Sequence, residues 1–256
     1  MKVFCRLAAV GAAVMLSCLV WAQEGPQIYN MSFDHWSKRG GTWYPYAADA
    51  TPSQRIWDTA NPGMKAAGIV SARPEYEHVA VPGEGKAAAR IESRKVAWLF
   101  VAGNLYSGRF IKLVDFKGAE TELGVPFAAR PFSLSGYYHY IPRKINHTGS
   151  GYEDMEGKPD EAFIEVLLTD WTEPYHQRSH IDGFIDSDTD PHIIGIARQV
   201  IKKGTSGYVR FDVPFEYRSD KMPSYVQFTV TSSRLGGFGT GAVGSVIYID
   251  EFQFNY

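Results

Sequence analysis

Aromatic rings gather with amide and guanidinium side chains in two stretches of this sequence. Residues 36–61 contain three tryptophans, and residues 130–140 contain an arginine and three tyrosines. Aromatic rings stack on the apolar C–H faces of sugars, while amides and arginine hydrogen-bond the hydroxyls. The pattern indicates a sugar-contacting surface, although any single ring could instead pack in the core of a large β-sandwich. The candidate residues are Trp36, Trp57, Asn61, Asn104, Arg130, Tyr137, Tyr138 and Tyr140.

Oxygen-bearing side chains near the two ends of the chain suggest a cation site. Residues 30–36 and 245–256 resemble short strands, and pairing these strands would bring Asp34 close to Asp250. Calcium prefers several oxygen ligands, including carboxylates and amide carbonyls, so Asn30 could contribute as well. The pattern indicates a candidate structural Ca²⁺ site at Asn30, Asp34 and Asp250. The alternative, which is slightly favoured, is that each aspartate caps a turn or accepts a hydrogen bond from a neighbouring backbone amide.

A hydrolytic reaction on a glycoside would need two carboxylates across a cleft. Most candidates lie in or beside the polar segment 146–160, and Glu165 lies on a predicted strand. Burial of Glu165 would raise its pKa. Exposure on the solvent face is the favoured expectation, because charged residues are seldom fully buried. Sequence does not give the separation between carboxylates, so catalysis stays open at this point. The candidates are Glu153, Asp154, Glu156, Asp160, Glu161 and Glu165.

The first 22 residues have the pattern of a signal peptide. A basic start with Lys2 and Arg6 precedes an apolar run, and Ala22 offers a cleavage position. Both cysteines lie in this leader, so the exported protein would have no disulfide. We expect export to the periplasm or cell surface; lipid attachment at Cys18 is the less favoured alternative.

Composition excludes several classes of partner. Removing the leader leaves 24 basic and 28 acidic residues, a net charge of −4. The sequence shows no basic stripe, so nucleic acid is not an expected partner. After the leader, no apolar run is long enough for a transmembrane span. The oligomeric state is not determined by these features.

Short strands and turns account for most of the remaining chain. Segments 109–116, 162–168, 208–213 and 225–230 are rich in β-branched and aromatic residues, and glycine and proline separate them. No convincing long helix is present; residues 193–203 could form a strand or a short helix. Residues 146–160 and 172–190 form two long loops, which in a compact domain usually carry function or lack order. The pattern predicts an all-β sandwich, one domain over residues 23–256.

Alternation within the strands predicts which side chains face the core. Ala162, Ile164, Val166 and Leu168 share one face of their strand. Around residue 138, Tyr138 and Tyr140 share one face, and Tyr137 shares the other with His139. In the last strand, Ile247 and Ile249 fall on the opposite parity to Phe252 and Phe254. A β-bulge near Asp250 and Glu251 would bring all four to the core.

Several motifs in order give the chain a family resemblance. They are WDTAN (57–61), AGNLYSGRF (102–110), RPFSLSGYYHYIP (130–142), DEAFIEVLL (160–168), TVTSSRLGGFGTGAVGS (229–245) and YIDEFQF (248–254). Their sequence and spacing resemble the putative carbohydrate metabolism domain family, PCMD, of exported Bacteroidetes proteins. The resemblance implies a jelly-roll β-sandwich related to carbohydrate-binding modules, in which calcium often lies between the chain ends. It implies no established activity.

Three functions remain compatible with the sequence. The first is an exported protein that recognises an oligo- or polysaccharide glycan through aromatic and polar surface residues. The second is a glycoside hydrolase or related carbohydrate-active enzyme. The third is a structural or adhesion component that binds a protein partner through an exposed apolar patch.

Overall fold

The computed structural model describes residues 25–81, 85–114 and 118–256. The predicted leader, residues 1–22, lies outside these residues. The described chain is nearly all strand and loop: its one α-helix is the single turn α1 (Asn61–Met64), and four short 3-10 turns accompany it. None of the helices in this described part is long and apolar enough to span a membrane. The prediction of an all-β chain is confirmed.

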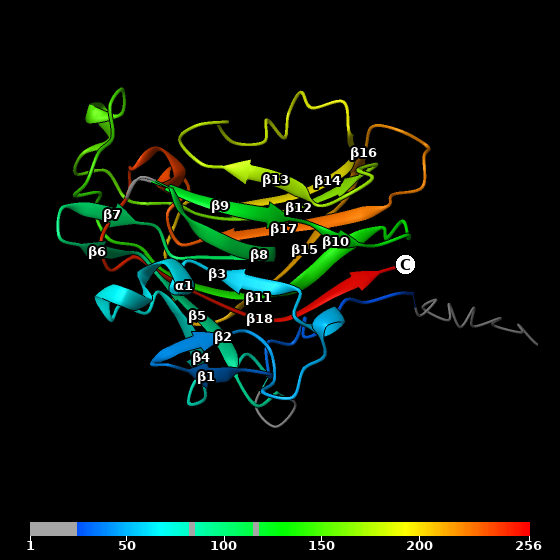
Figure 1. The fold of residues 1–256 in the computed structure, drawn as a ribbon, viewed down its shortest axis with the longest axis horizontal. Helices are drawn as coiled ribbons and strands as arrows, with labels where there is room; N and C mark the ends of the chain where they lie inside the picture. Colours follow the sequence, from blue (N-terminus) through cyan, green and yellow to red (C-terminus); the bar gives the residue numbers. More distant parts are fainter. Residues whose placement is uncertain (1–24, 82–84, 115–117) are drawn as a thin grey trace, which may run out of the picture.

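Two antiparallel sheets stack face to face, and we call them the upper and lower sheets after their positions in Figure 1. In spatial order the strands of the upper sheet are β13 (Tyr175–Arg178), β9 (Gly118–Leu123), β8 (Asn104–Val114), β17 (Tyr225–Thr231), β12 (Ala162–Thr169), β14 (Ile193–Ile201) and β16 (Glu216–Tyr217). Two short strands join this sheet as well: β10 (Val125–Pro126) pairs with β17, and β3 (Trp57–Thr59) pairs with β8.

The other strands of the described residues belong to the lower sheet and to two hairpins. The hairpins are β1 (Ser37–Arg39) with β2 (Thr42–Tyr44), and β6 (Arg94–Val96) with β7 (Leu99–Val101). Gly40 and Gly41 both have positive φ at the β1–β2 turn, a conformation that glycine adopts without strain. The lower sheet runs in the order β15 (Val209–Pro214), β11 (Ser133–Ile141), β18 (Val246–Asn255), β5 (Ala88–Glu92) and β4 (Ala72–Glu75).

The core lies between the sheets and follows the predicted alternation. Ala162, Ile164, Val166 and Leu168 of β12 are fully buried, as are Val226, Phe228 and Val230 of β17. Residues 193–201 form β14, which settles the strand-or-helix alternative in favour of a strand. The apolar faces meet because each strand alternates its side chains across the sheet.

The predicted bulge in the last strand is present. Ser135 pairs with Gln253 and Tyr137 with Asp250, so β18 carries one more residue than β11 between these pairs. Glu251 has φ of 49°, and Ile249 and Phe252 on either side of the bulge are both buried. The extra residue therefore changes the parity of the strand and keeps both apolar pairs in the core.

The N-terminal segment follows the C-terminal strand without becoming a strand itself. Residues 29–32 form a turn, and Asn30 and Phe33 have positive φ, which corrects the expectation of a first strand over residues 30–36. The Gln27 side chain bonds both backbone groups of Phe254, and the Met31 carbonyl accepts a hydrogen bond from the Phe252 amide. The two ends of the described chain are thus held together by these hydrogen bonds and by the edge-on contact of Phe33 with Phe252.

Candidate functional site

Three loops border an open cavity of about 1070 Å³ on the outer face of the upper sheet. The loop between β13 and β14 runs above this sheet in Figure 1, and the turns at residues 153–155 and 236–238 rise beside it. Outward-facing side chains of β12 and β14 form the floor. We call this cavity the loop pocket; its lining includes Tyr152, Phe163, His180, Phe184, Asp186, Ser187, Asp188, Arg198, Val200, Arg234 and Phe238.

Aromatic rings from three separate loops meet in the wall of the loop pocket. Tyr152 stacks on Phe238 with 5.3 Å between ring centroids, and Phe184 meets Phe238 edge-on at 5.5 Å. Phe184 is 41% exposed and Phe238 50% exposed, so their faces remain accessible. A Cβ at Gly237 would lie 2.7 Å from the Phe184 ring, so glycine permits this approach. The cluster can stack on an apolar face of a ligand.

The turn that carries Phe238 is anchored from below by Asp160. This buried carboxylate accepts hydrogen bonds from the Ser233 hydroxyl at 2.5 Å and the Ala242 amide at 2.8 Å. Burial raises the pKa of Asp160, and these hydrogen bonds oppose the increase. Arg234 at the start of the turn donates to Glu161 at 2.7 Å. Asp160 therefore serves the architecture of the pocket wall.

The floor presents a guanidinium held in place by three oxygen acceptors. Arg198 donates through Nε to Glu165 at 2.7 Å, through Nη1 to Asp188 at 2.8 Å and through Nη2 to Ser187 at 2.6 Å. The Ser187 hydroxyl donates to Glu165 at 3.0 Å. Since a guanidinium has five N–H donors, two remain for a ligand. An oriented arginine beside exposed rings suits a ligand that has both apolar faces and hydroxyls.

The environment of Glu165 perturbs its ionisation. Its position on the outer face would expose it, but the β13–β14 loop covers this part of the sheet and packs Ile185 on Leu167. Burial raises the pKa of Glu165, and the hydrogen bond from Arg198 works in the opposite direction. The expectation that Glu165 would be exposed on the solvent face was therefore wrong, and the less favoured buried alternative is the one observed.

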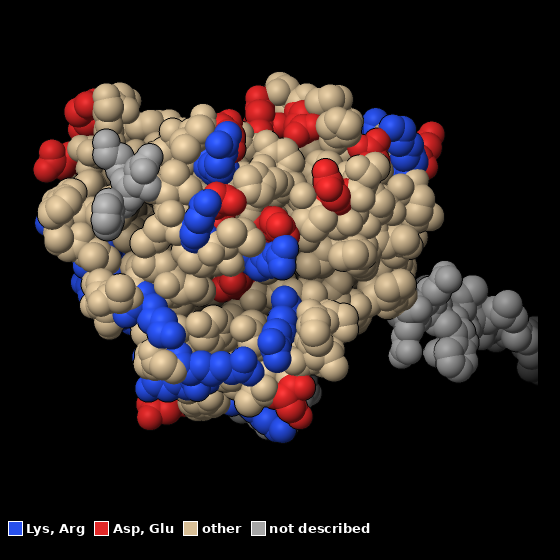
Figure 2. Space-filling model, viewed as in Figure 1, with Lys and Arg blue, Asp and Glu red and all other residues tan. Residues whose placement is uncertain are grey.

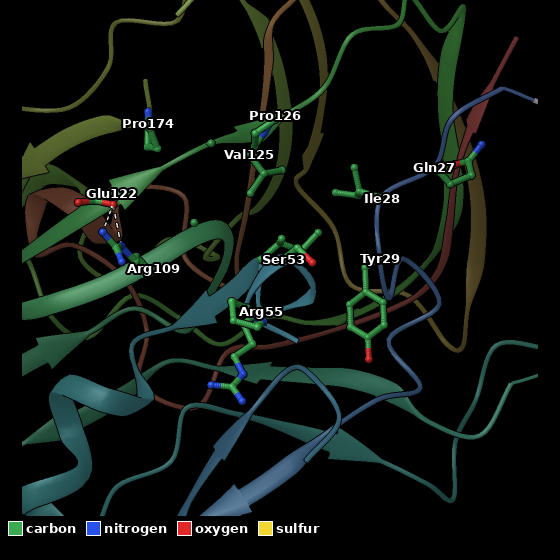
Figure 3. Close-up of a pocket in the computed structure, with 14 residues that line it drawn as sticks. Gln27, Ile28, Tyr29, Ser53, Arg55, Arg109, Glu122, Val125, Pro126 and Pro174 are labelled. Carbon is green, nitrogen blue, oxygen red and sulfur yellow. Dashed lines mark hydrogen bonds and ion pairs between the residues drawn. The ribbon is translucent and has the colours of Figure 1, made fainter. Parts of the chain in front are cut away.

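A second, open groove of about 630 Å³ lies where the N-terminal segment passes the edge of the upper sheet. Figure 3 shows Tyr29 and Arg55 on its two sides, with the ion pair between Arg109 and Glu122 further along. We call it the N-terminal groove. Apolar side chains contribute much of its lining, namely Ile28, Pro52, Ile56, Val125, Pro126 and Pro174.

Three of the eight predicted sugar-contacting residues are core residues, which corrects their assignment to a surface. Trp57 is 1% exposed and lies edge-on to Phe228 at 5.1 Å. Tyr140 is fully buried and donates to the Ser232 carbonyl at 3.1 Å. The buried amide of Asn61 bonds the backbone of Trp43, Ser71 and Ala72. Trp57 and Tyr140 are buried because their rings are largely apolar. Asn61 is buried because its amide hydrogen-bonds backbone groups inside the protein.

The other five residues are spread over the molecule. Trp36 and Tyr138 pack against the core, whereas Tyr137 lies on the opposite face of β11, as the alternation predicts. Arg130 lies over the Tyr217 ring at 3.9 Å and bonds the carbonyls of Ser219 and Lys221. Asn104 is in the upper sheet, and its buried Oδ1 has no hydrogen-bond partner. None of the eight lines the loop pocket or the N-terminal groove.

The expected calcium ligands fit a cation only in part. Asp34 and Asp250 lie close enough for Asp34 to raise the pKa of Asp250, but Asn30 directs its amide to His35 and Pro45. Asp34 accepts hydrogen bonds from the amides of Lys86 and Ala87, and Asp250 from those of Ala80 and Glu251. Among the described residues, no group of three or more histidine, cysteine, aspartate or glutamate side chains has an arrangement suited to a metal.

The pocket residues that sequence reasoning missed are isolated aromatics in loops. Tyr152 and Phe184 fall within the two long segments singled out as function-bearing, and Phe238 lies in a glycine-rich turn. Glycine precedes each ring; polar or glycine residues flank Tyr152 and Phe238 on both sides, whereas Ile185 follows Phe184. An isolated ring in a loop is less often needed to fill the core. The position of these rings in loops was the one sequence signal for the pocket. The sequence alone does not show that the three loops meet in space.

The architecture is an antiparallel β-sandwich with a ligand-sized pocket built on loops beside one sheet. The chain belongs to the family described as Putative carbohydrate metabolism domain, PCMD, whose model matches residues 32–255. The family resemblance inferred from the sequence is thereby confirmed, and the protein carries a carbohydrate-related domain.

Two solved structures share the fold. A putative glycoside hydrolase from Bacteroides thetaiotaomicron aligns over 91% of this chain and 72% of its own, with TM-score 0.68 and 21% identity. A putative glycoside hydrolase from Bacteroides vulgatus aligns over 87% of this chain and 96% of its own, with TM-score 0.65 and 19% identity. The carbohydrate-binding module CBM28 aligns over 82% of this chain at TM-score 0.37 and 11% identity. No curated protein matches the sequence.

Proposed function

We propose that this protein is an exported glycan-binding protein and that the loop pocket is its binding site. The observation that carries the proposal is the exposed cluster of Tyr152, Phe184 and Phe238 beside the oriented guanidinium of Arg198. The rings stack on the C–H face of a sugar, and the arginine donates to its hydroxyls. Membership of the carbohydrate-related family supports the same ligand class.

Binding to a panel of neutral polysaccharides tests the proposal. Phe238→Ala and Phe184→Ala remove exposed rings, and each should weaken binding by roughly two- to twelvefold, since a stacking contact of this kind is worth about 0.5–1.5 kcal/mol. Phe132→Ala is the matched control, because Phe132 is 72% exposed and lines neither cavity. Equal affinity of all three variants and wild type for every bound glycan would refute the assignment of the site.

Export is the second part of the proposal and rests on the sequence of residues 1–22. We propose that cleavage after Ala22 releases a single domain beginning at Gln23. N-terminal sequencing of the protein recovered from the periplasm or cell surface checks this, with Gln23 as the expected first residue. Recovery with a lipid on Cys18 would support the anchored alternative, and an intact leader in the cytoplasm would contradict both.

Glycoside hydrolysis is a second candidate that one observation favours. Glu165 is a buried carboxyl with a raised pKa directly beneath the pocket guanidinium, and a general acid needs such a pKa. The two structures with the shared fold are each described as a putative glycoside hydrolase. Release of reducing ends from a bound glycan, abolished by Glu165→Gln while binding persists, would establish catalysis. Binding without release in wild type would leave recognition as the function.

A further inference from the structure

Four exposed cations lie around the β1–β2 hairpin and the residues that follow it, and we call them the cationic patch: Lys38, Arg39, Arg55 and Lys65. Figure 2 shows basic side chains crowded over the lower part of this face, where β1 and β2 lie in Figure 1. None of the four has a carboxylate partner within ion-pair distance among the described residues. Elsewhere, exposed arginines such as Arg109, Arg178 and Arg234 are paired with acidic side chains.

Two members of the cationic patch share one aromatic ring. The guanidinium carbon of Arg55 lies 5.7 Å from the centroid of the Tyr46 ring, and that of Arg39 lies 6.0 Å from it. Each arginine also donates one hydrogen bond to a backbone carbonyl, Arg39 to Ala48 at 2.7 Å and Arg55 to Ala50 at 3.0 Å. These contacts orient the guanidinium groups and leave most of their N–H donors unused.

One carboxylate near this cluster, that of Asp58, forms no ion pair with it. Asp58 lies near Tyr46, but its two carboxylate oxygens accept hydrogen bonds from the amides of Thr59 at 2.8 Å and Phe110 at 2.9 Å. Burial raises the pKa of Asp58 to about 6, so this carboxylate is still mostly ionised at pH 7 and offsets one of the four positive charges. The patch therefore keeps a local excess of positive charge on a chain whose formal net charge is −2.

Arg55 also lines the N-terminal groove, so the cationic patch and the groove are continuous. The Tyr29 ring lies across the groove from Arg55 in Figure 3, and Ser53 lies between them. The groove offers an apolar and aromatic surface of the size of a sugar ring or two, next to guanidinium groups that pair bidentately with carboxylate or sulfate. An acidic sugar presents both features in one molecule.

We infer that the cationic patch and the N-terminal groove form a second binding site, for an anionic saccharide. Arg39 and Arg55 bind its carboxylate or sulfate group, and the groove beside Tyr29 receives the sugar ring. The site shares no lining residue with the loop pocket. Loss of one binding activity would therefore leave the other intact, and the two proposals fail separately.

Two polymer pairs test this inference and separate carboxylate from sulfate. Binding of polygalacturonate is compared with that of its methyl ester, and binding of dextran sulfate with that of dextran. The expected result is at least tenfold tighter binding of one or both anionic polymers than of its neutral counterpart, with affinity falling as salt is raised. No preference for either anionic polymer would overturn the inference.

Matched variants locate the site. Arg39→Gln/Arg55→Gln should lose at least tenfold in affinity for the anionic polymer, while Lys202→Gln/Lys203→Gln removes the same charge from exposed positions elsewhere and should lose less than threefold. Unchanged unfolding midpoints show that both doubles fold. Equal losses of affinity in the two double variants would show that binding depends on net charge alone, which would contradict a site at Arg39 and Arg55. Equally tight binding of a single-stranded oligonucleotide of similar charge would contradict an acidic saccharide as the ligand.

Discussion

Glu165 and Arg198 face each other across the β12–β14 ladder, with 2.7 Å between Glu165 Oε2 and Arg198 Nε. The Glu165 side chain is 9% exposed and that of Arg198 is 30% exposed. The pair therefore does two things at once. It compensates a carboxylate that the β13–β14 loop has covered, and it holds a guanidinium at the floor of the loop pocket.

Removing the arginine should make stability strongly dependent on pH. In Arg198→Met, Glu165 loses its charged partner, and its pKa in the folded state rises further above that of the unfolded chain. The folded state then retains a proton that the unfolded state releases, so stability falls as pH rises from 5 to 8. Breaking a fully buried pair costs about 3–5 kcal/mol. Because Arg198 is 30% exposed, we expect a loss at or below the lower end of that range, with most of it at pH 8.

Urea denaturation at pH 5 and pH 8 measures this difference. Glu165→Gln/Arg198→Met is the control, because it removes both charges and should regain most of the stability at pH 8. A loss in Arg198→Met that is the same at both pH values would contradict the role assigned to the pair.

Trp57→Ala should destabilise the protein and leave the binding of neutral glycans at the loop pocket unchanged. The indole is 1% exposed, meets Phe33 and Phe228 edge-on, and donates to the Tyr29 carbonyl at 2.6 Å. Such a truncation costs about 3–5 kcal/mol. Trp98 is 82% exposed, so Trp98→Ala should change the unfolding free energy by less than about 0.5 kcal/mol. Native-like stability of Trp57→Ala with lost glycan binding would return Trp57 to the list of surface residues.

The strands were predictable because their signal is local. Val226, Phe228 and Val230 alternate with polar neighbours, and the same parity rule located the bulge at Glu251 from the phases of Ile249 and Phe252. The N-terminal segment was not predictable in this way. Its turn depends on Asn30 and Phe33 at positive φ and on hydrogen bonds to β18, over 200 residues away in sequence.

The candidate site could not be predicted from the sequence, because it depends on which residues the tertiary structure brings together. Trp57 and Phe238 are both aromatic, yet one fills the core and the other stands on a loop over the sheet. The unpaired charge of Arg39 and Arg55 is a property of their surroundings, since the whole chain is slightly acidic. Composition excluded a basic stripe along the sequence, but it could not exclude a patch assembled by folding.

Asp250 should make the protein less stable as pH rises from about 4 to 7. The carboxyl is fully buried, and burial, with smaller contributions from Glu251 and Asp34, raises its pKa to about 7. Between the unfolded and folded pKa values, the folded state binds a proton that the unfolded state has lost, so stability decreases with pH. Each pKa unit corresponds to about 1.4 kcal/mol, which makes the total effect on the order of 4 kcal/mol.

Asp250→Asn isolates this contribution. The amide cannot ionise, but its NH₂ group faces one of the two backbone amides that the carboxylate accepts from, so the variant should be less stable at pH 5 by about 1–3 kcal/mol. The deficit should shrink or reverse at pH 8. Asp58 contributes a decline of the same sign in both proteins, so the difference between them reports Asp250. A deficit that is constant with pH would contradict the raised pKa.

A cation between the ends of the chain remains a prediction for Asp34 and Asp250, without Asn30. A divalent ion would relieve the repulsion that Asp34 and Glu251 exert on Asp250, and it would favour the ionised carboxyl. Stabilisation by calcium should therefore be larger at pH 8 than at pH 5. At a hundredfold excess over the dissociation constant it would amount to about 2.7 kcal/mol. The measurement is the unfolding midpoint of metal-stripped protein with and without calcium, in wild type and in Asp250→Ala. We expect calcium to raise the midpoint in wild type alone; a midpoint that calcium leaves unchanged at pH 8 would rule out a stabilising ion at this position.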